Sequence, residues 1–468
     1  MKLKFCGAAR EVTGSAHLLT LDSGYKILLD CGLYQGSREL EKYNQSWLFN
    51  PEEIDCVVLS HAHIDHSGRL PQLVRDGFQG IIHSTHATRS LCSIMLLDSA
   101  HIQVKDAEYA NRRKARRAKG KAFKPREPLY VIEDVKPTMD LFATYGYNRW
   151  FSIHPDVDVL FRDAGHILGS ATVTLRIREQ GKTRFVGFTG DVGRPDRPIL
   201  RDPQPMPEVD FLLCETTYGD RLHEAKPQET DRLLGIIRET CIERKGKLII
   251  PAFSVGRTQE VVYMLDQMET EGKLPRVPVF VDSPLAVNAT MIFGSHPECF
   301  DEDLNEYMLI DDNPFGFNQL TYVRSVDMSK ELNVMQEPCI IISSAGMMNA
   351  GRIVHHLKHG ISDPRNTFLL VGYCTPETPC GQLRDGKEEI RIFGETKPVR
   401  ARIERMESFS AHADRKELLD FIRPQAGRVK RVFLVHGTLD RQESFRDYLL
   451  ENGFDDVAIP RLGETVEL

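Results

Sequence analysis

Short apolar segments, alternating or continuous, dominate the first half of the chain. The pattern predicts strands at 2–7, 15–21, 25–32, 54–60, 80–85, 157–169, 171–177, 183–193 and 209–219. The second and third of these strands are joined by a hairpin turn at Asp22-Ser23-Gly24. Residues 90–150 are mostly helical in pattern. This β-rich alternation predicts two packed sheets with helices outside them.

The pattern changes to strand, loop and helix in repetition between about residues 217 and 396. Apolar strands at 247–251, 277–282, 337–343 and 366–371 each precede a loop, and most of these loops lead into a helical segment. Such alternation predicts a parallel sheet with crossover helices. The β-rich pattern then resumes. It predicts two further strands, each followed by a loop that contains a histidine, at 399–414 and 429–437. We therefore expect one domain, made of 1–216 and 397–468, with a second domain inserted at 217–396.

The loops after the strands of this inserted segment are rich in Gly, Ser and Arg. In open α/β sheets ligands bind beyond the carboxyl ends of the strands. These residue types suit contact with phosphate, although plain turn chemistry explains each loop equally well. The candidate phosphate contacts are Arg257, Ser344 and Arg352.

Charge and cysteine content narrow the class of protein. The net charge of −7 means that a polyanion must meet a local basic patch, and residues 111–126 offer one because they contain many Lys and Arg and no acid. A solvated helix is the alternative for this run. The 10 cysteines include no C-x-x-C pair, so we expect free, buried thiols in a reducing compartment. No apolar stretch is long enough for a membrane span, and the first residues lack the apolar run of a signal peptide, which together predict a cytoplasmic protein.

The sharpest motif is the run His61-Ala62-His63-Ile64-Asp65-His66, directly after a buried strand. Alternate residues of an extended loop point the same way, so His61 and His63 can hold one ion while Asp65 and His66 turn toward another. Imidazole nitrogen and carboxylate oxygen suit zinc. A purely structural role would leave several polar groups unsatisfied at a strand end. Further candidate ligands at similar strand ends are Asp30, His166, Asp191, His412 and His436.

Taken in order, these motifs resemble those of the metallo-β-lactamase superfamily. Glu215 in CETTYG, His412 in SAHAD and His436 in LVHG resemble the additional motifs of its β-CASP group of nucleases, and the resemblance covers essentially the whole chain. It implies an αββα sandwich with an inserted β-CASP domain. The chain looks most similar to bacterial and archaeal RNases akin to the nuclease that processes pre-mRNA 3′ ends.

The resemblance also implies roles for the individual residues. One zinc ion would be held by His61, His63 and His166, and a second by Asp65, His66 and His436, with Asp191 bridging both. Asp30 would orient a histidine ligand from behind. The catalytic residues would be Asp65, Glu215 and His412, with His412 as the general acid and Glu215 holding its ring.

The implied activity is hydrolysis of single-stranded RNA by a hydroxide activated between two zinc ions. Manganese or iron could occupy such a site instead. A DNA nuclease, a hydrolase of a small ester or thioester, and an inactive RNA-binding scaffold are the alternatives. The filled ligand positions argue against the scaffold, and the inserted domain argues against a small substrate. The oligomeric state stays open, with a homodimer as one option.

Overall fold

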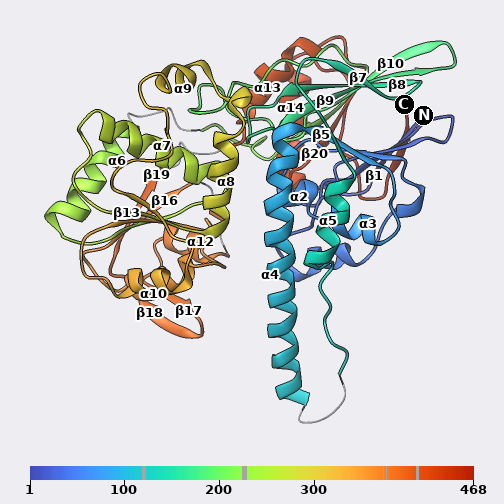
Figure 1. Ribbon diagram of the computed structural model, residues 1–468. Helices are drawn as coiled ribbons and strands as arrows, with labels where there is room; N and C mark the ends of the chain where they lie inside the picture. Colours follow the sequence, from blue (N-terminus) through green and yellow to red (C-terminus); the bar gives the residue numbers. More distant parts are fainter. Residues whose placement is uncertain (119–122, 224–228, 373, 376, 407–410) are drawn as a thin grey trace. The chain divides into compact units, whose positions relative to one another are not determined.

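The computed structural model describes residues 1–118, 123–223, 229–372, 374–375, 377–406 and 411–468 (Figure 1). They form two compact units. Unit 1 consists of Met1–Arg197, Arg201–Leu222 and His412–Leu468, and unit 2 of Pro198–Leu200 and His223–Ala411. The domain boundaries expected from the sequence stay predictions. None of the helices in the described parts of the chain is both long and apolar enough to cross a membrane.

Unit 1 contains two seven-stranded sheets. The first has the order β22-β1-β2-β3-β4-β5-β6. Its strands are β1 (Lys2–Phe5), β2 (His17–Thr20), β3 (Lys26–Leu29), β4 (Cys56–Val58), β5 (Ile81–Thr85), β6 (Phe142–Tyr145) and β22 (Thr465–Glu467). The strands β1 to β3 form an antiparallel meander, and β3 to β6 run parallel. The edge strand β6 lies within a stretch that we expected to be mostly helical.

The second sheet of unit 1 has the order β21-β20-β11-β10-β9-β8-β7. Its strands are β7 (Trp150–His154), β8 (Val157–Asp163), β9 (Ala171–Glu179), β10 (Lys182–Phe188), β11 (Phe211–Glu215), β20 (Arg431–Val435) and β21 (Val457–Ala458). Strand β11 pairs in parallel with β20, from Phe211 opposite Arg431 to Glu215 opposite Val435. The strands on either side of the long insertion are therefore direct neighbours.

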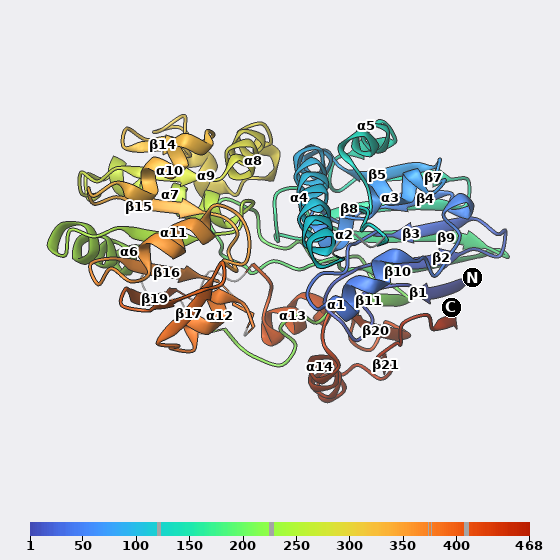
Figure 2. The same cartoon turned by 90° about the horizontal axis from the view of Figure 1, so that it is seen from below.

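The two sheets pack face to face over one apolar core, because both contribute inward side chains such as Leu29, Val58, Phe161, Phe188 and Phe433. A second core joins the β11–β20 sheet to α13 (Arg415–Ile422) and α14 (Leu439–Glu451). The remaining helices are α1 (Arg38–Glu41), α2 (Ile64–Ser67), α3 (Leu70–Arg75), α4 (His86–Ala118) and α5 (Ile132–Asp140). Within unit 1, Figure 2 shows α4 and α5 on one side of the sheets and α14 on the other. This is the expected αββα sandwich.

Unit 2 is built on a six-stranded parallel sheet of order β14-β13-β15-β12-β16-β19. Its strands are β12 (Leu248–Pro251), β13 (Val279–Asp282), β14 (Leu320–Tyr322), β15 (Ile340–Ser343), β16 (Thr367–Val371) and β19 (Arg402–Met406), and β17 (Glu389–Ile392) and β18 (Glu395–Pro398) form a hairpin. The helices are α6 (Glu229–Ile237), α7 (Arg257–Thr270), α8 (Pro284–Gly294), α9 (Glu302–Tyr307), α10 (Val326–Val334), α11 (Ile353–Gly360) and α12 (Pro379–Arg384). The expected parallel sheet with flanking helices is confirmed.

Two details of the sequence interpretation need correction. The strand at 402–406, which we grouped with the returning β-rich segment, pairs with β16 in unit 2. Eight cysteines are buried free thiols as expected, but Cys374 and Cys380 are joined by a disulfide, so the expectation of free thiols was wrong for this pair.

Candidate metal centre

Most candidate site residues of unit 1 lie at or just after the carboxyl ends of strands. Strands β3 and β4 are parallel neighbours in the first sheet, and β10, β11 and β20 are parallel neighbours in the second. The candidate residues at or after the ends of these strands and in the loop after β8 are Asp30, His61, His63, Asp65, His66, His166, Asp191, Glu215 and His436. Residues far apart in the sequence therefore meet at one edge of the sandwich.

The turn that carries the histidine run is held by the backbone of a neighbouring loop. The carbonyl of Asp65 accepts a hydrogen bond from the N–H of Ser15, and the carbonyl of His66 accepts one from the N–H of Cys31. Gly32 passes so close that an added Cβ would lie 1.6 Å from the carbonyl oxygen of Asp65. Only glycine fits at this position, and its close approach fixes the short helix α2 on which Asp65 and His66 lie.

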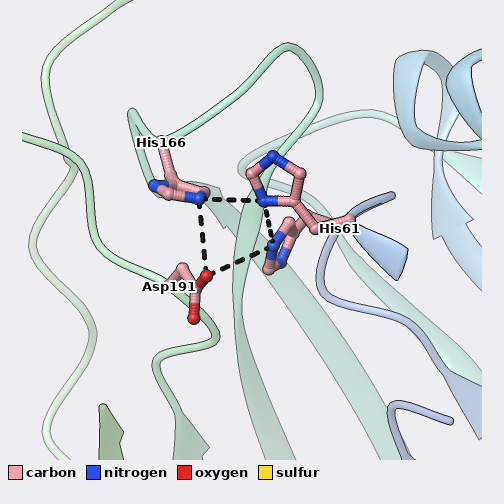
Figure 3. Close-up of side chains that lie close together, drawn as sticks. His61, His166 and Asp191 are labelled. Atoms are coloured by element: carbon pink, nitrogen blue, oxygen red, sulfur yellow. Dashed lines mark hydrogen bonds and ion pairs between the residues drawn. The ribbon is translucent and has the colours of Figure 1, made fainter. Parts of the chain in front are cut away.

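One cluster of ligand atoms comprises His61, His63, His166 and Asp191, whose atoms lie within 4.8 Å of one another. Figure 3 shows His61, His166 and Asp191 with their ring nitrogens and carboxylate oxygen directed toward each other. Oδ2 of Asp191 lies 3.4 Å from Nε2 of His61 and 3.4 Å from Nε2 of His166. Nδ1 of His63 lies 3.1 Å from both of these ring nitrogens.

A second cluster comprises Asp65, His66 and His436. Nε2 of His66 lies 3.0 Å from Nε2 of His436, which in turn lies 3.5 Å from Oδ2 of Asp65. The other oxygen of Asp191, Oδ1, faces this cluster at 3.3 Å from Nε2 of His66. The Asp191 carboxylate therefore presents one oxygen to each cluster.

The position of Asp191 depends on tight backbone packing. Gly190, directly before it, has a φ of +54°, and an added Cβ would lie 2.8 Å from Cβ of Ser60. Only glycine allows this close approach of the backbone to Ser60. Asp30 and His436 also adopt positive φ values, 60° and 53°, which non-glycine residues rarely adopt outside functional sites.

A third group joins Asp191 to Glu215 and His412. Nδ1 of His412 lies 3.3 Å from Oε1 of Glu215. Glu215 is fully buried and is held in turn by the N–H groups of Val192 and Thr217, at 2.7 and 3.2 Å. His412 is partly exposed, and an isolated bridge between its backbone and Gly193 places it beside the Asp191 loop. The pair has the geometry of a ring oriented by a carboxylate.

Burial and the neighbouring carboxylates shift the pKa values of the histidines in opposite directions: His61 and His63 are held neutral, whereas His66 and His412 are favoured as cations. Burial lowers the pKa of His61 to about 3 and that of His63 to about 4, so both rings are neutral and offer a lone pair. Burial also opposes charge on His66, but Asp191 and Asp30 outweigh it and raise the pKa of that ring. Burial acts in the same way on His412, and Glu215 and Asp191 raise its pKa to about 9.

The donor set fits a divalent metal ion. In a tetrahedral site with metal–nitrogen bonds of 2.0–2.1 Å, ligand nitrogens lie roughly 3.4 Å apart, which is close to the separations seen between the facing rings. Oδ1 of Asp191 is buried and accepts no hydrogen bond from the described residues. A buried carboxylate oxygen that accepts no hydrogen bond is costly unless an ion completes its surroundings. Imidazole and carboxylate ligands together suit zinc and its transition-metal neighbours.

The three candidate phosphate contacts lie in unit 2, and each has a partner there. Arg257 begins α7 and pairs with Glu260. Nη1 of Arg352 lies 2.7 Å from Oδ1 of the buried Asp282. The hydroxyl of Ser344 lies 2.7 Å from that of Ser283, which caps the N-terminus of α8. Their predicted role as phosphate contacts stays a prediction.

Three supporting residues were missed by the sequence interpretation. The hydroxyl of Ser60 donates to Oδ2 of Asp30 at 2.9 Å and contacts Nδ1 of His61 at 3.0 Å. The hydroxyl of Ser15 lies 3.2 Å from Oδ2 of Asp30, and that of Thr217 lies 2.9 Å from Nδ1 of His436. Ser60 adjoins His61 and Thr217 lies two residues after Glu215, so a search for hydroxyls beside the candidate ligands would have found these two. Ser15 carries no such signal.

Comparison with known families gives three consecutive matches. Residues 9–225 match the metallo-beta-lactamase superfamily, residues 258–383 the Beta-Casp domain, and residues 396–460 the Zn-dependent metallo-hydrolase RNA specificity domain. The first match contains the histidine run, His166, Asp191 and Glu215, and the third contains His412 and His436.

Several known proteins are similar to the chain over most of its length. Ribonuclease TTHA0252 of Thermus thermophilus is 37% identical over 468 residues, which is 100% of both chains. Transcription termination factor FttA of Methanosarcina mazei is 32% identical over 92% of this chain and 66% of that protein. The RNase J-like protein of Methanocaldococcus jannaschii is 30% identical over 95% of this chain and 94% of that protein.

Proposed function

The chain belongs to the β-CASP group of the metallo-β-lactamase superfamily, and on that premise we propose that it is a metal-dependent ribonuclease that hydrolyses phosphodiester bonds in single-stranded RNA. The observation that carries the proposal is the Asp191 carboxylate, which faces one histidine cluster with each oxygen and lies beside a histidine that Glu215 orients. This arrangement pairs a site for two cations with a proton donor, and phosphodiester hydrolysis needs both.

In this proposal the two clusters hold two zinc ions per chain, with manganese or iron as the alternatives. His61, His63 and His166 would hold one ion and Asp65, His66 and His436 the other, and Asp191 would offer one oxygen to each. Bound ions supply a nucleophile from water near neutral pH and offset the charge of the phosphate. Asp30 fixes the His66 ring through Nδ1, and Thr217 fixes the His436 ring in the same way.

His412 is the proposed general acid. Its Nδ1 faces Glu215, so Nε2 is the ring nitrogen that can donate a proton to the leaving oxygen of the substrate. The carboxylates of Glu215 and Asp191 keep the ring protonated near neutral pH, because they raise its pKa.

We also propose that the carboxyl ends of β12, β13 and β15 in unit 2 contact substrate phosphates. Ser283 and Ser344 place two hydroxyls 2.7 Å apart at the N-terminus of α8, where backbone N–H groups favour an anion. Arg257 follows β12 and Arg352 follows β15, so both supply positive charge after parallel neighbouring strands, although their carboxylate partners Glu260 and Asp282 make them the weaker candidates.

We propose RNA as the substrate, in preference to DNA or a small ester, because of the names that similar proteins carry. Two of the similar proteins are named as ribonucleases or as RNase J-like, and one matched region is named for RNA specificity. A homodimer stays open and can be tested by light scattering.

The test is cleavage of a 5′-labelled single-stranded RNA, run beside a DNA of the same sequence and beside a reaction with chelator. We expect chelator-sensitive cleavage of the RNA that returns when zinc or manganese is added back, and the product lengths separate endonuclease from 5′-exonuclease action. The variant His412→Ala should cleave slowly, while His359→Ala, which changes an exposed histidine of unit 2, should cleave as the wild type does. Metal-loaded protein that leaves the RNA intact would refute the proposal.

A further inference from the structure

The second half of α4 carries a surface that the proposed catalytic centre does not use. Among the described residues between Ala107 and Arg117, no side chain other than that of Ala107 is buried. Figure 1 shows the end of α4 extending past the other elements of unit 1, with the returning chain beside it. We call residues 108–118 of α4, together with the returning segment 123–130, the basic arm. The positions 119–122 of the basic run noted in the sequence lie outside the described residues.

Side-chain hydrogen bonds tie the two halves of the basic arm together. The amide of Asn111 donates to the carbonyl of Arg126 at 2.8 Å and accepts from its N–H at 2.7 Å. The returning segment is also held to the part of α4 before the basic arm, because the N–H of Leu129 donates to the side chain of Gln103 at 3.1 Å and the hydroxyl of Tyr130 donates to Ser99 at 2.8 Å. The paired segment therefore gives α4 a fixed inner face.

The opposite face of α4 gathers cations around an exposed aromatic ring. At about 100° per residue, Tyr109, Arg112, Arg113, Arg116 and Arg117 fall within roughly 140° of one another on the helix, whereas Gln103, Ala107 and Asn111 point the other way. Tyr109 is 63% exposed. Exposed tyrosine among arginines is the combination that binds unpaired nucleotides, since bases stack on the ring while guanidinium groups hold phosphates.

These arginines lack the acidic neighbours that commonly pair with cations on a solvent-exposed helix. Within the described parts of the chain, Arg112, Arg113, Arg116 and Arg117 have no carboxylate in ion-pair contact, and Arg112/Arg116 and Arg113/Arg117 are like-charge pairs one turn apart. Such like-charge pairs destabilise an isolated helix. The helix dipole stabilises cations near the C-terminus, but only modestly. An anionic ligand removes that repulsion, and the planar guanidinium favours phosphate.

The cations lie far from the candidate metal centre along the helix. The first turn of α4 is fixed beside the His166 loop, because the hydroxyls of Thr85 and Thr88 both donate to the carbonyl of Gly169, at 2.6 and 2.8 Å. From Thr88 to Arg112 the helix rises about 36 Å at 1.5 Å per residue. That distance corresponds to roughly ten stacked nucleotides at about 3.4 Å each.

We propose that the basic arm is a second RNA-binding site, which holds single-stranded RNA by its phosphates and by a base stacked on Tyr109, about ten nucleotides from the metal centre. The proposal deepens the ribonuclease proposal and rests on it for the identity of the ligand. It requires that long RNAs gain affinity from the basic arm and that RNAs too short to reach both sites do not.

The test compares the full-length protein with the fourfold variant Arg112→Gln, Arg113→Gln, Arg116→Gln, Arg117→Gln. Binding of labelled 30-nucleotide and 5-nucleotide single-stranded RNAs is measured by fluorescence anisotropy in chelator, at several salt concentrations. The variant should bind the 30-mer about tenfold or more weakly, and the slope of log affinity against log salt should decrease by about 0.7 for each phosphate that the arginines neutralise in the wild type. The variant Tyr109→Ala alone should weaken 30-mer binding by about fivefold or more.

A matched control removes four exposed cations of unit 1 that already have a carboxylate partner, namely Lys2→Gln, Arg428→Gln, Lys430→Gln, Arg431→Gln. It changes the net charge by the same amount and should bind the 30-mer nearly as the wild type does. Tyr109→Ala changes one exposed side chain, so it tests the proposal even if the fourfold variant folds poorly.

The outcomes separate this proposal from the ribonuclease proposal. Weaker 30-mer binding by both basic-arm variants, with unchanged cleavage of the 5-mer, supports a second site. Unchanged 30-mer binding overturns it, and so does an equal loss of affinity by the matched control. A wild type that cleaves neither RNA contradicts the ribonuclease proposal, while the anisotropy comparison still decides whether the basic arm binds RNA.

Discussion

Oδ2 of Asp30 lies 2.6 Å from Nδ1 of His66, and Nε2 of the same ring lies 3.3 Å from Oδ1 of Asp191. Asp30 thereby determines which ring nitrogen of His66 is turned toward the cluster. Asp30 is itself fixed by the N–H and the hydroxyl of Ser60, at 2.8 and 2.9 Å. Carboxylates behind a histidine ligand of this kind commonly strengthen metal binding.

We therefore expect Asp30→Ala to weaken the affinity for the metal ion that His66 contacts by about 10- to 100-fold. The measurement is a competition titration with a chromogenic chelator. Asp140→Ala removes an exposed carboxylate at the end of α5 and serves as the control. Equal metal affinities for Asp30→Ala and the wild type would show that Asp30 has only a packing role.

Replacement of Asp191 by Asn should affect both ions, because each carboxylate oxygen faces a different cluster. We expect the metal content, measured by elemental analysis, to fall from about two ions per chain to one or fewer. Asp191→Asn retains the shape of the side chain, so a folding defect is not expected. Two ions retained at full affinity would contradict the bridging role.

The His412–Glu215 pair predicts a change in rate without a change in metal content. His412→Ala should slow RNA cleavage by about 10²- to 10⁴-fold at saturating metal. Glu215→Gln removes the carboxylate that raises the pKa of His412, so the pH above which activity declines should move downward. Elemental analysis of both variants should match the wild type. Loss of metal from His412→Ala would instead make His412 a ligand.

Asp163 makes stability depend on pH. Burial raises its pKa to about 7, against about 3.9 in an unfolded chain, although the N–H of Gly165 donates to Oδ1 at 2.9 Å. Because the folded-state pKa is raised, the protonated carboxyl contributes stability that is fully present below about pH 4 and is lost as the pH rises through 7. Asp163→Asn keeps an acceptor for Gly165 and carries no charge.

The variant Asp163→Asn should therefore gain thermal stability relative to the wild type as the pH increases from 4 to 8, by at most about 4 kcal/mol. The measurement is the unfolding midpoint of both metal-free proteins across this range. Asp140→Asn, at an exposed position, should follow the wild type at every pH. A constant difference between Asp163→Asn and the wild type would mean that Asp163 is ionised throughout.

The sequence was sufficient for most of the strands and for the histidine run because both signals are local. A buried strand at 56–58 followed by four ligand-type side chains is visible within about ten residues. By contrast, the contact between His66 and His436 joins positions 370 residues apart and depends on the parallel pairing of β11 with β20. No local pattern encodes that pairing, so the family resemblance had to supply it.

Other features depended on surroundings that the sequence does not display. Strand β19 (RIERM) is an edge strand with mixed burial, and its residues do not indicate which sheet it joins. Arg257 and Arg352 stood out as basic residues in loops, yet their carboxylate partners Glu260 and Asp282 become visible only in three dimensions. The hydroxyl of Ser15 contacts Asp30 only in three dimensions, and serine is too common a residue type to mark this role in the sequence.

The pairing of β11 with β20 also has a consequence for synthesis of the protein. Because β20 follows unit 2 in the sequence, the candidate metal centre can be completed only after unit 2 has been translated. Six of the seven proposed ligands lie within the first 191 residues, but His436 is translated only after the whole of unit 2. At 5–20 residues per second, the ribosome needs roughly 10–45 s to pass from Glu215 to His436. A partly synthesised chain therefore lacks one ligand of the proposed metal centre, and the proposed ribonuclease would complete its site only after the whole of unit 2 has been translated.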